Sequence, residues 1–141
     1  MSRAAFYEAL VHDSILNGLG INEDTVFHNW SSEERPSNEN AFAILRWGEE
    51  GGPIWGSEVD RGPRDVTVWV HFPSELTNDF DEVTKVLNRM DVVLADLRDV
   101  SGNDGYTLSF VKVGGRSPDL LDEGFNTITR NANYAVYSVL S

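Results

Sequence analysis

The sequence contains no cysteine, which excludes disulfides, thiolate zinc sites and cysteine nucleophiles. It also lacks any apolar run approaching the roughly 20 residues that a membrane-spanning helix requires. The first residues, MSRAAFYEALVHDS, contain no apolar core of signal-peptide length. We therefore expect a soluble chain that is made in a cytoplasm-like compartment and has no membrane partner.

Basic residues are scarce. Eleven Lys and Arg stand against 23 Asp and Glu, which gives a formal net charge of −12. A protein that binds nucleic acid through its phosphates needs the opposite sign. The carboxylates are spread along the chain, and the simplest interpretation is solubility with little non-specific association. A second interpretation is a surface that must repel a polyanion.

Recognisable catalytic and metal-binding motifs are lacking as well. None of the three histidines, His12, His28 and His71, has a second histidine four residues away, as a helical metal pair requires. We interpret His71 as an edge-strand residue. The segment 99–105, DVSGNDG, fails the calcium-loop pattern because Phe110 stands where the bidentate glutamate belongs. The sequence contains no GxSxG, P-loop or GxGxxG motif, so we expect no enzyme, no cofactor and no metal site.

What is present indicates one folded domain over residues 1–141, because 40% of the residues are hydrophobic and 11% are aromatic. The expected elements are a helix from Ser2 to Gly18 or Gly20, strands at 41–47 and 64–72, a helix at 79–98, and strands at 106–113 and 126–140. Long loops are expected at 20–40, where TVFHNW is short enough for no more than a brief strand, and at 47–65 and 114–125. This order predicts an α+β fold: a mostly antiparallel sheet of about four strands with two helices packed on one face.

Two segments carry the clearest periodicity. In 64–72 the apolar residues alternate with Thr67, Trp69 and His71, as in a strand with one buried face. In 79–98 Asp79 and Glu82 resemble a capping box, and apolar residues follow at three- and four-residue steps. That helical stripe comprises Phe80, Val83, Leu87, Met90, Leu94 and Leu97, widened by Val86 and Val93.

The stretch 47–65, WGEEGGPIWGSEVDRGPRD, is far longer than the two to five residues that a hairpin connection needs. Tryptophan is enriched at interface hot spots, and flanking charges can set the register against a neighbouring copy. We therefore predict an assembly arm, with the alternative that its two tryptophans fold back onto the domain's own core. The candidate assembly-interface residues are Trp47, Ile54, Trp55, Val59, Arg61 and Arg64.

The segments VHDSILNGLGI, AFAILRW, RDVTVWVHFPSELTNDFDEVTKVLNRMDVVL and TITRNANYAVYSVL, in this order, cover nearly the whole chain. Together they resemble the tail terminator proteins of phages with long, non-contractile tails, in the form carried by phages of actinobacteria. The segment around WVHFP and DFDEV and the final strand carry most of this resemblance. Its motifs are patterns of strand, proline and helix rather than catalytic residues.

The resemblance implies a structural virion protein that assembles in the host cytoplasm. Such proteins are α+β domains that form a hexameric ring on the tail tube, end its elongation and present a surface to the neck proteins of the head. The implied partners are further copies of the chain, the tail tube protein below and the head-tail connector or stopper above. DNA passes through the lumen without specific binding, and an acidic lumen would repel its phosphates over a Debye length of about 8 Å.

Three alternatives remain open. The chain could be a head-tail stopper or another neck ring protein, since these are also small and acidic. It could instead be a small acidic inhibitor or DNA mimic, although Lys85, Arg89 and Arg98 alternate with the acidic residues around the second helix. A ligand-binding α/β module would require a polar-lined pocket, which the sequence does not exclude.

Overall fold

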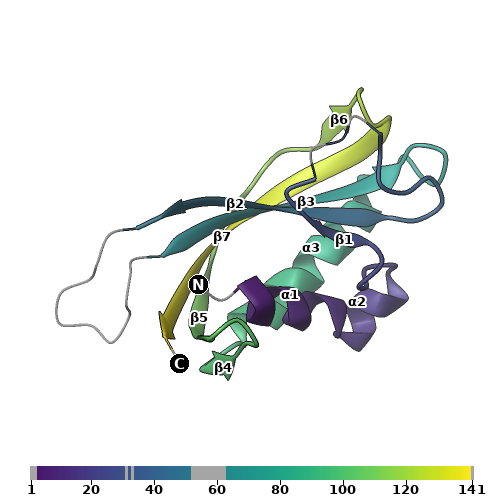
Figure 1. The fold of residues 1–141 in the computed structure, drawn as a ribbon. Helices are drawn as coiled ribbons and strands as arrows, with labels where there is room; N and C mark the ends of the chain where they lie inside the picture. Colours follow the sequence, from purple (N-terminus) through teal and green to yellow (C-terminus); the bar gives the residue numbers. More distant parts are fainter. Residues whose placement is uncertain (1–2, 31, 33, 52–62, 141) are drawn as a thin grey trace.

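The computed structural model describes residues 3–30, 32, 34–51 and 63–140. The described residues form three helices and one seven-stranded sheet (Figure 1). The elements in chain order are α1 (Arg3–Val11), α2 (Ser14–Gly18), β1 (Val26–His28), β2 (Phe42–Glu50), β3 (Arg64–Pro73), α3 (Phe80–Ala95), β4 (Val100–Ser101), β5 (Tyr106–Arg116), β6 (Leu120–Asp122) and β7 (Thr127–Leu140).

The sheet is mixed, with the strand order β1-β2-β3-β7-β5-β4, and β6 pairs with β7 beside this path. β1 runs parallel to β2, whereas the other pairs are antiparallel. The prediction of a mostly antiparallel sheet of about four strands with two helices on one face was therefore wrong. In the described part of the chain, the sheet has more strands, and three short to medium helices accompany it.

The strands beyond the four expected are too short to show a period. β1 and β6 have three residues each, and β4 has two. β1 lies in the expected loop 20–40 and confirms the brief strand considered there. β6, together with the last residues of β5, occupies much of the expected loop 114–125. Backbone pairing with the long strand β7, rather than side-chain pattern, makes β6 extended.

The central strands confirm the alternation in the sequence. In β3 the side chains of Val66, Val68 and Val70 are buried, and they pair with Tyr134, Ala132 and Arg130 of β7. The apolar stripe of α3 packs against this inner face, and the stripe residues Val83, Val86, Leu87, Met90 and Leu94 are fully buried. Asp79 caps α3 as expected, accepting a hydrogen bond from the backbone of Asp81.

The first helix is interrupted. The sequence predicts one helix up to Gly18 or Gly20, but the chain breaks after Val11 and restarts at Ser14. Asp13 causes the break, because its carboxylate caps α2 by accepting from the backbone N–H of Leu16 at 3.0 Å. The same carboxylate receives two hydrogen bonds from Arg89 of α3, at 2.9 and 2.8 Å. Gly20, with φ +93°, ends the segment as its position predicted.

All three helices lie on the same side of the sheet, and the β2–β3 ribbon extends away from them (Figure 1). α3 contacts β3, β5 and β7, while α1 packs on α3. No helix of the described part lies on the opposite face of the sheet. We call that side the open face.

Asp13 joins both helical segments to α3, so its removal should destabilise the fold. Asp13→Ala is expected to lower the free energy of unfolding by about 1 kcal/mol through the lost cap alone. The hydrogen bonds from Arg89 hold the pKa of Asp13 below its usual range. The wild-type advantage over Asp13→Ala should therefore be full above pH 4 and shrink as the pH falls through that lowered pKa.

Urea unfolding between pH 3 and pH 7 measures this difference. Glu39→Ala, which removes an exposed carboxylate from a loop, serves as the control and should change little. Equal stability of wild type and Asp13→Ala at neutral pH would contradict the role assigned to Asp13.

Candidate assembly surfaces

The predicted assembly-interface residues divide between two parts of the chain. Trp47 belongs to β2 and Arg64 to β3, on the same antiparallel ribbon. The other four, Ile54, Trp55, Val59 and Arg61, fall within 52–62 and lie outside the described residues. The long connection is itself shorter than predicted, since β2 continues to Glu50 and β3 begins at Arg64.

Trp47 packs on its own domain, as the alternative interpretation of the tryptophans foresaw. Its ring meets Phe6 edge to face at 5.3 Å between centroids, and the guanidinium of Arg3 lies 5.5 Å from its centroid. Its indole N–H donates to Nδ1 of His28 at 3.2 Å. Arg64 is mostly covered and approaches Glu50 at 4.0 Å. Both residues therefore brace the base of the ribbon.

The open face presents aromatic and polar side chains, and the charged residues Asp65, Lys112 and Arg46 are among them. At the β5–β7 side, the rings of Phe110 and Tyr137 stack at 4.4 Å with an interplanar angle of 11°. Beside them, Lys112 lines a shallow groove of about 380 Å³ with Thr67 and Asn133. Phe110 remains 38% exposed, which is high for a phenylalanine on a folded domain.

A second groove on the open face, of about 260 Å³, lies between β2, β3 and the turn after β6. Its lining residues are Ile44, Arg46, Trp69, His71, Asp122 and Phe125. The expectation that His71 is an edge residue was wrong, because β3 is a central strand between β2 and β7. His71 is 3% exposed, stacks on Phe42 at 4.9 Å and shares a 2.8 Å hydrogen bond with Thr127.

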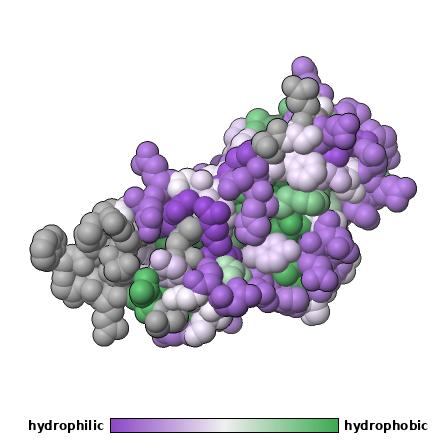
Figure 2. Space-filling model, in the orientation of Figure 1, coloured by the Kyte–Doolittle hydropathy of each residue, from purple (hydrophilic) through white to green (hydrophobic). Residues whose placement is uncertain are grey.

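The helix side of the molecule carries a third groove, of about 690 Å³, between α1 and α3. Its lining residues are Glu8, Ala9, His12, Asp13, Arg89, Val92, Val93, Asp96 and Leu97. Val92 is 59% exposed there, and Ile15 nearby is 52% exposed. Figure 2 shows a largely hydrophilic surface on the viewed side, interrupted by a few apolar patches.

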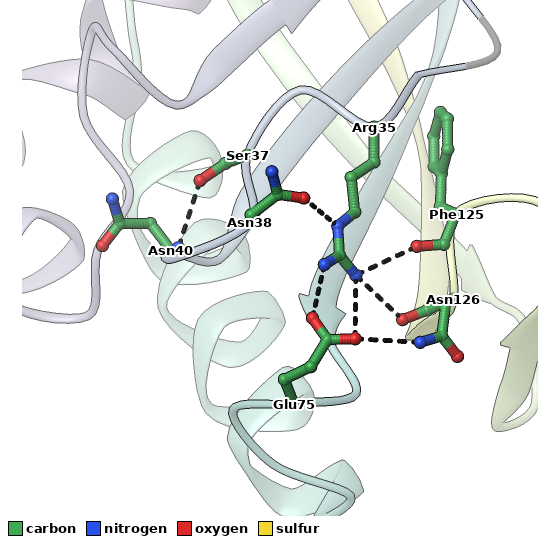
Figure 3. A network of polar contacts seen from close by, with 7 residues as sticks. All are labelled: Arg35, Ser37, Asn38, Asn40, Glu75, Phe125 and Asn126. Carbon is green, nitrogen blue, oxygen red and sulfur yellow. Dashed lines mark hydrogen bonds and ion pairs between the residues drawn. The ribbon is translucent and has the colours of Figure 1, made fainter.

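The loops at one end of the sheet are held together by Arg35 (Figure 3). Its guanidinium pairs with Glu75 and also donates to the carbonyl oxygens of Phe125 and Asn126, at 3.1 and 3.3 Å. The amide of Asn126 donates to Glu75 at 2.9 Å. The hydrogen bond from Arg35 lowers the pKa of Glu75, so the pair stays charged at neutral pH. This cluster fixes three loops against one another.

These surfaces were not visible in the sequence. Phe110, Tyr137 and Lys112 lie in segments that read only as strands, and their meeting on one face depends on the β5–β7 register. The one available signal is the apolar alternation of the even-numbered residues from Ile128 to Leu140, which places the odd-numbered Tyr137 opposite the core side. The α1–α3 groove depends on the break at Asp13, for which the sequence offered only the preference of aspartate for helix caps.

Among the described residues, no group of three or more His, Asp or Glu side chains is placed to hold a metal ion. No helix in the described ranges is both long and apolar enough to cross a membrane.

Comparison with known proteins identifies the fold. No protein-family model matches the chain, and no curated protein is similar to it in sequence. Among solved structures, a chain of the virion of a native gene transfer agent particle superposes with a TM-score of 0.65. The alignment covers 98% of both chains at 11% sequence identity. The two chains therefore share a fold along their full length.

The buried histidine makes stability depend on acid. Burial lowers the pKa of His71 from 6.5 to about 4. Between these two pH values the histidine is protonated in the unfolded chain but neutral in the folded chain. The free energy of unfolding should keep its full value above pH 6.5 and fall by about 3 kcal/mol as the pH drops toward 4. His71→Gln, which stays uncharged, should remove most of this pH-dependent loss.

The measurement is chemical unfolding of wild type and variant at pH 7, 5.5 and 4.5. His12→Gln is the matched control, because the His12 side chain is 63% exposed and should leave the profile unchanged. A His71→Gln profile parallel to the wild-type profile would contradict the assignment.

Proposed function

We propose that the chain is a structural protein of a phage-like virion. The observation that carries the proposal is the shared fold with a chain of the gene transfer agent virion, over 98% of both chains. The proposed work is assembly rather than catalysis. Apolar side chains exposed on both the helix side and the open face, including Val92 and Phe110, support such a role.

More specifically, we propose that the chain is a tail terminator. In this function it forms a hexameric ring that caps the tail tube, ends its elongation and joins the tail to the neck of the head. The support is the resemblance of its strand, proline and helix pattern to that family. The tail tube protein and the head-tail connector are the partners, and DNA passes through the ring without specific binding.

The stretch 47–65 contributes to this function as a contact arm, with Ile54, Trp55, Val59 and Arg61 as its contacting residues. Trp47 and Arg64 fix the ribbon from which it leaves the domain. A DNA mimic would instead gather its carboxylates on one face. Exposed carboxylates occur here on α1, α3, the end of β2 and several loops, which favours the structural role.

The proposal is tested by locating the chain in purified particles. Cryo-electron microscopy should show a single ring of six copies between the tail tube and the head connector. Particles made without the gene should carry tails of uncontrolled length that fail to join heads, because nothing caps the tube. Particles assembled from the Trp55→Ala variant, whose contact arm is weakened, should form with lower yield.

Other outcomes point elsewhere. A ring bound to the head side, together with tails of normal length in the deletion, would identify a stopper instead. Absence from particles, with the chain bound to a host protein, would overturn the structural proposal and favour the acidic inhibitor.

A further inference from the structure

Lys112 stands apart from the other cations that the structure describes. The rest have partners: Arg35, Arg64, Lys85, Arg89, Arg116 and Arg130 form ion pairs, Arg3 lies over Trp47, and Arg46 and Arg98 donate to backbone carbonyls. The side chain of Lys112 forms no ion pair or hydrogen bond with any described residue, although Asp65 of β3 lines the same groove. It is exposed on the open face, beside the Phe110–Tyr137 stack.

Asp96 is an exposed carboxylate on the helix side that forms no ion pair with a described residue. It caps the C-terminal end of α3, where the helix dipole is negative and a carboxylate is unfavourable. The last turn of α3 contains no basic residue, and Arg98 donates to the carbonyls of Ala95 and Leu97 instead. A cation arriving from outside would relieve this unfavourable charge.

The groove beside Asp96 has an apolar floor and a charged rim, in which Glu8 pairs with His12 and Asp13 with Arg89. Asp96 is the carboxylate of this rim that has no such partner among the described residues. Ala9, Val92, Val93 and Leu97 contribute the apolar surface, and Glu8 lies with Asp96 among the lining residues. The aromatic stack on the open face offers the partly exposed rings of Phe110 and Tyr137, with Lys112 beside them and Asp65 on the far side of the adjoining groove. Apolar surface meets apolar surface, and positive charge meets negative charge, if the two regions face each other.

We propose that the open face of one copy docks on the α1–α3 groove of a second copy, with the Phe110–Tyr137 stack against Val92 and Leu97, and Lys112 directed at Asp96. The two surfaces lie on opposite sides of the sheet, so they cannot meet within one chain. The contact is therefore head to tail, and its repetition closes a ring when the rotation per copy allows it. This inference rests on the proposed ring and names the surfaces that build it.

Disulfide trapping tests the contact directly, because the natural chain contains no cysteine. A full-length variant with Lys112→Cys and Asp96→Cys should form a ladder of linked oligomers under mild oxidation. Each link must join residue 112 of one copy to residue 96 of the next, as mass spectrometry of the peptides would show. The matched control combines Lys112→Cys with Glu123→Cys, another exposed carboxylate, in the turn after β6, and should form few links.

Charge exchange provides an independent measurement of the same contact. Lys112→Glu should weaken self-association about tenfold, as measured by sedimentation. Adding Asp96→Lys in the same chain should restore most of it, because the pair is then reversed rather than broken. Lys85→Glu, an equal charge change on the exposed side of α3, should have a much smaller effect. Residues 112, 96 and 85 are all exposed, and the melting temperature of each variant confirms that it folds.

Two results would overturn the docking proposal. One is a negative disulfide-trapping result at the highest soluble concentration. The ladder of linked oligomers would then be no stronger than that of the Glu123 control, or its links would join residue 112 to residue 112. The other is a charge-reversed pair that associates no better than Lys112→Glu alone. A neck ring seen in particles without the 112–96 link would reject these surfaces and leave the terminator proposal standing. If the 112–96 link forms but the chain is absent from particles, the docking surfaces stand and the terminator proposal is rejected.

Discussion

The constraint on which the structure depends is that helices cover only one face of the sheet. Val66, Val68 and Val70 of β3 point toward α3 and are buried with its apolar stripe. The alternating residues of the same strand must then lie on the open face, whatever their chemistry, because the period of a strand is two. Burial of one face therefore creates a second face that no described helix covers, although Phe125 packs over Phe42 and His71 at one end of it. That face is where Thr67, Trp69 and the neighbouring aromatic residues gather.

The helix side is held in place by polar side chains that bridge the layers. Tyr134 of β7 is buried, and its hydroxyl donates to Asp91 of α3 at 2.6 Å. Burial, reinforced by this acidic partner, raises the pKa of Tyr134 well above its usual range, so the hydroxyl keeps its proton. Asp91 also accepts from Arg116, which ties the end of β5 to the helix. With Asp13 and Arg89 at the other helices, these bridges fix α1, α2 and α3 relative to the sheet, so the outer groove has a defined shape.

The sequence predicted the parts of the fold whose pattern is local. Val66 to Phe72 and the stripe from Phe80 to Leu97 were assigned correctly because many residues repeat one period. β4 and β6 were missed because two or three residues carry no period, and their strand geometry comes from pairing with β5 and β7. The break at Asp13 was missed because a cap and a partner 76 residues away decide it together. His71 was misplaced because the sequence does not reveal which strands lie on either side of β3. The open face and the α1–α3 groove, being products of this register and this break, could not be predicted from local pattern.

Charge sets the conditions under which such a chain can assemble. Six of the described Lys and Arg side chains are engaged in internal ion pairs, so the outer surface is more uniformly acidic than the composition alone suggests. Two copies with a net charge of −12 repel each other at long range, and salt screens this repulsion beyond about 8 Å at physiological ionic strength. Attraction between copies must therefore be short-ranged. It would come from apolar contact and from a few matched charges, such as the proposed pair of Lys112 and Asp96. Long-range repulsion with short-range attraction keeps free copies apart in dilute solution. It allows them to associate once another structure has already brought them side by side, as in the ring proposed above.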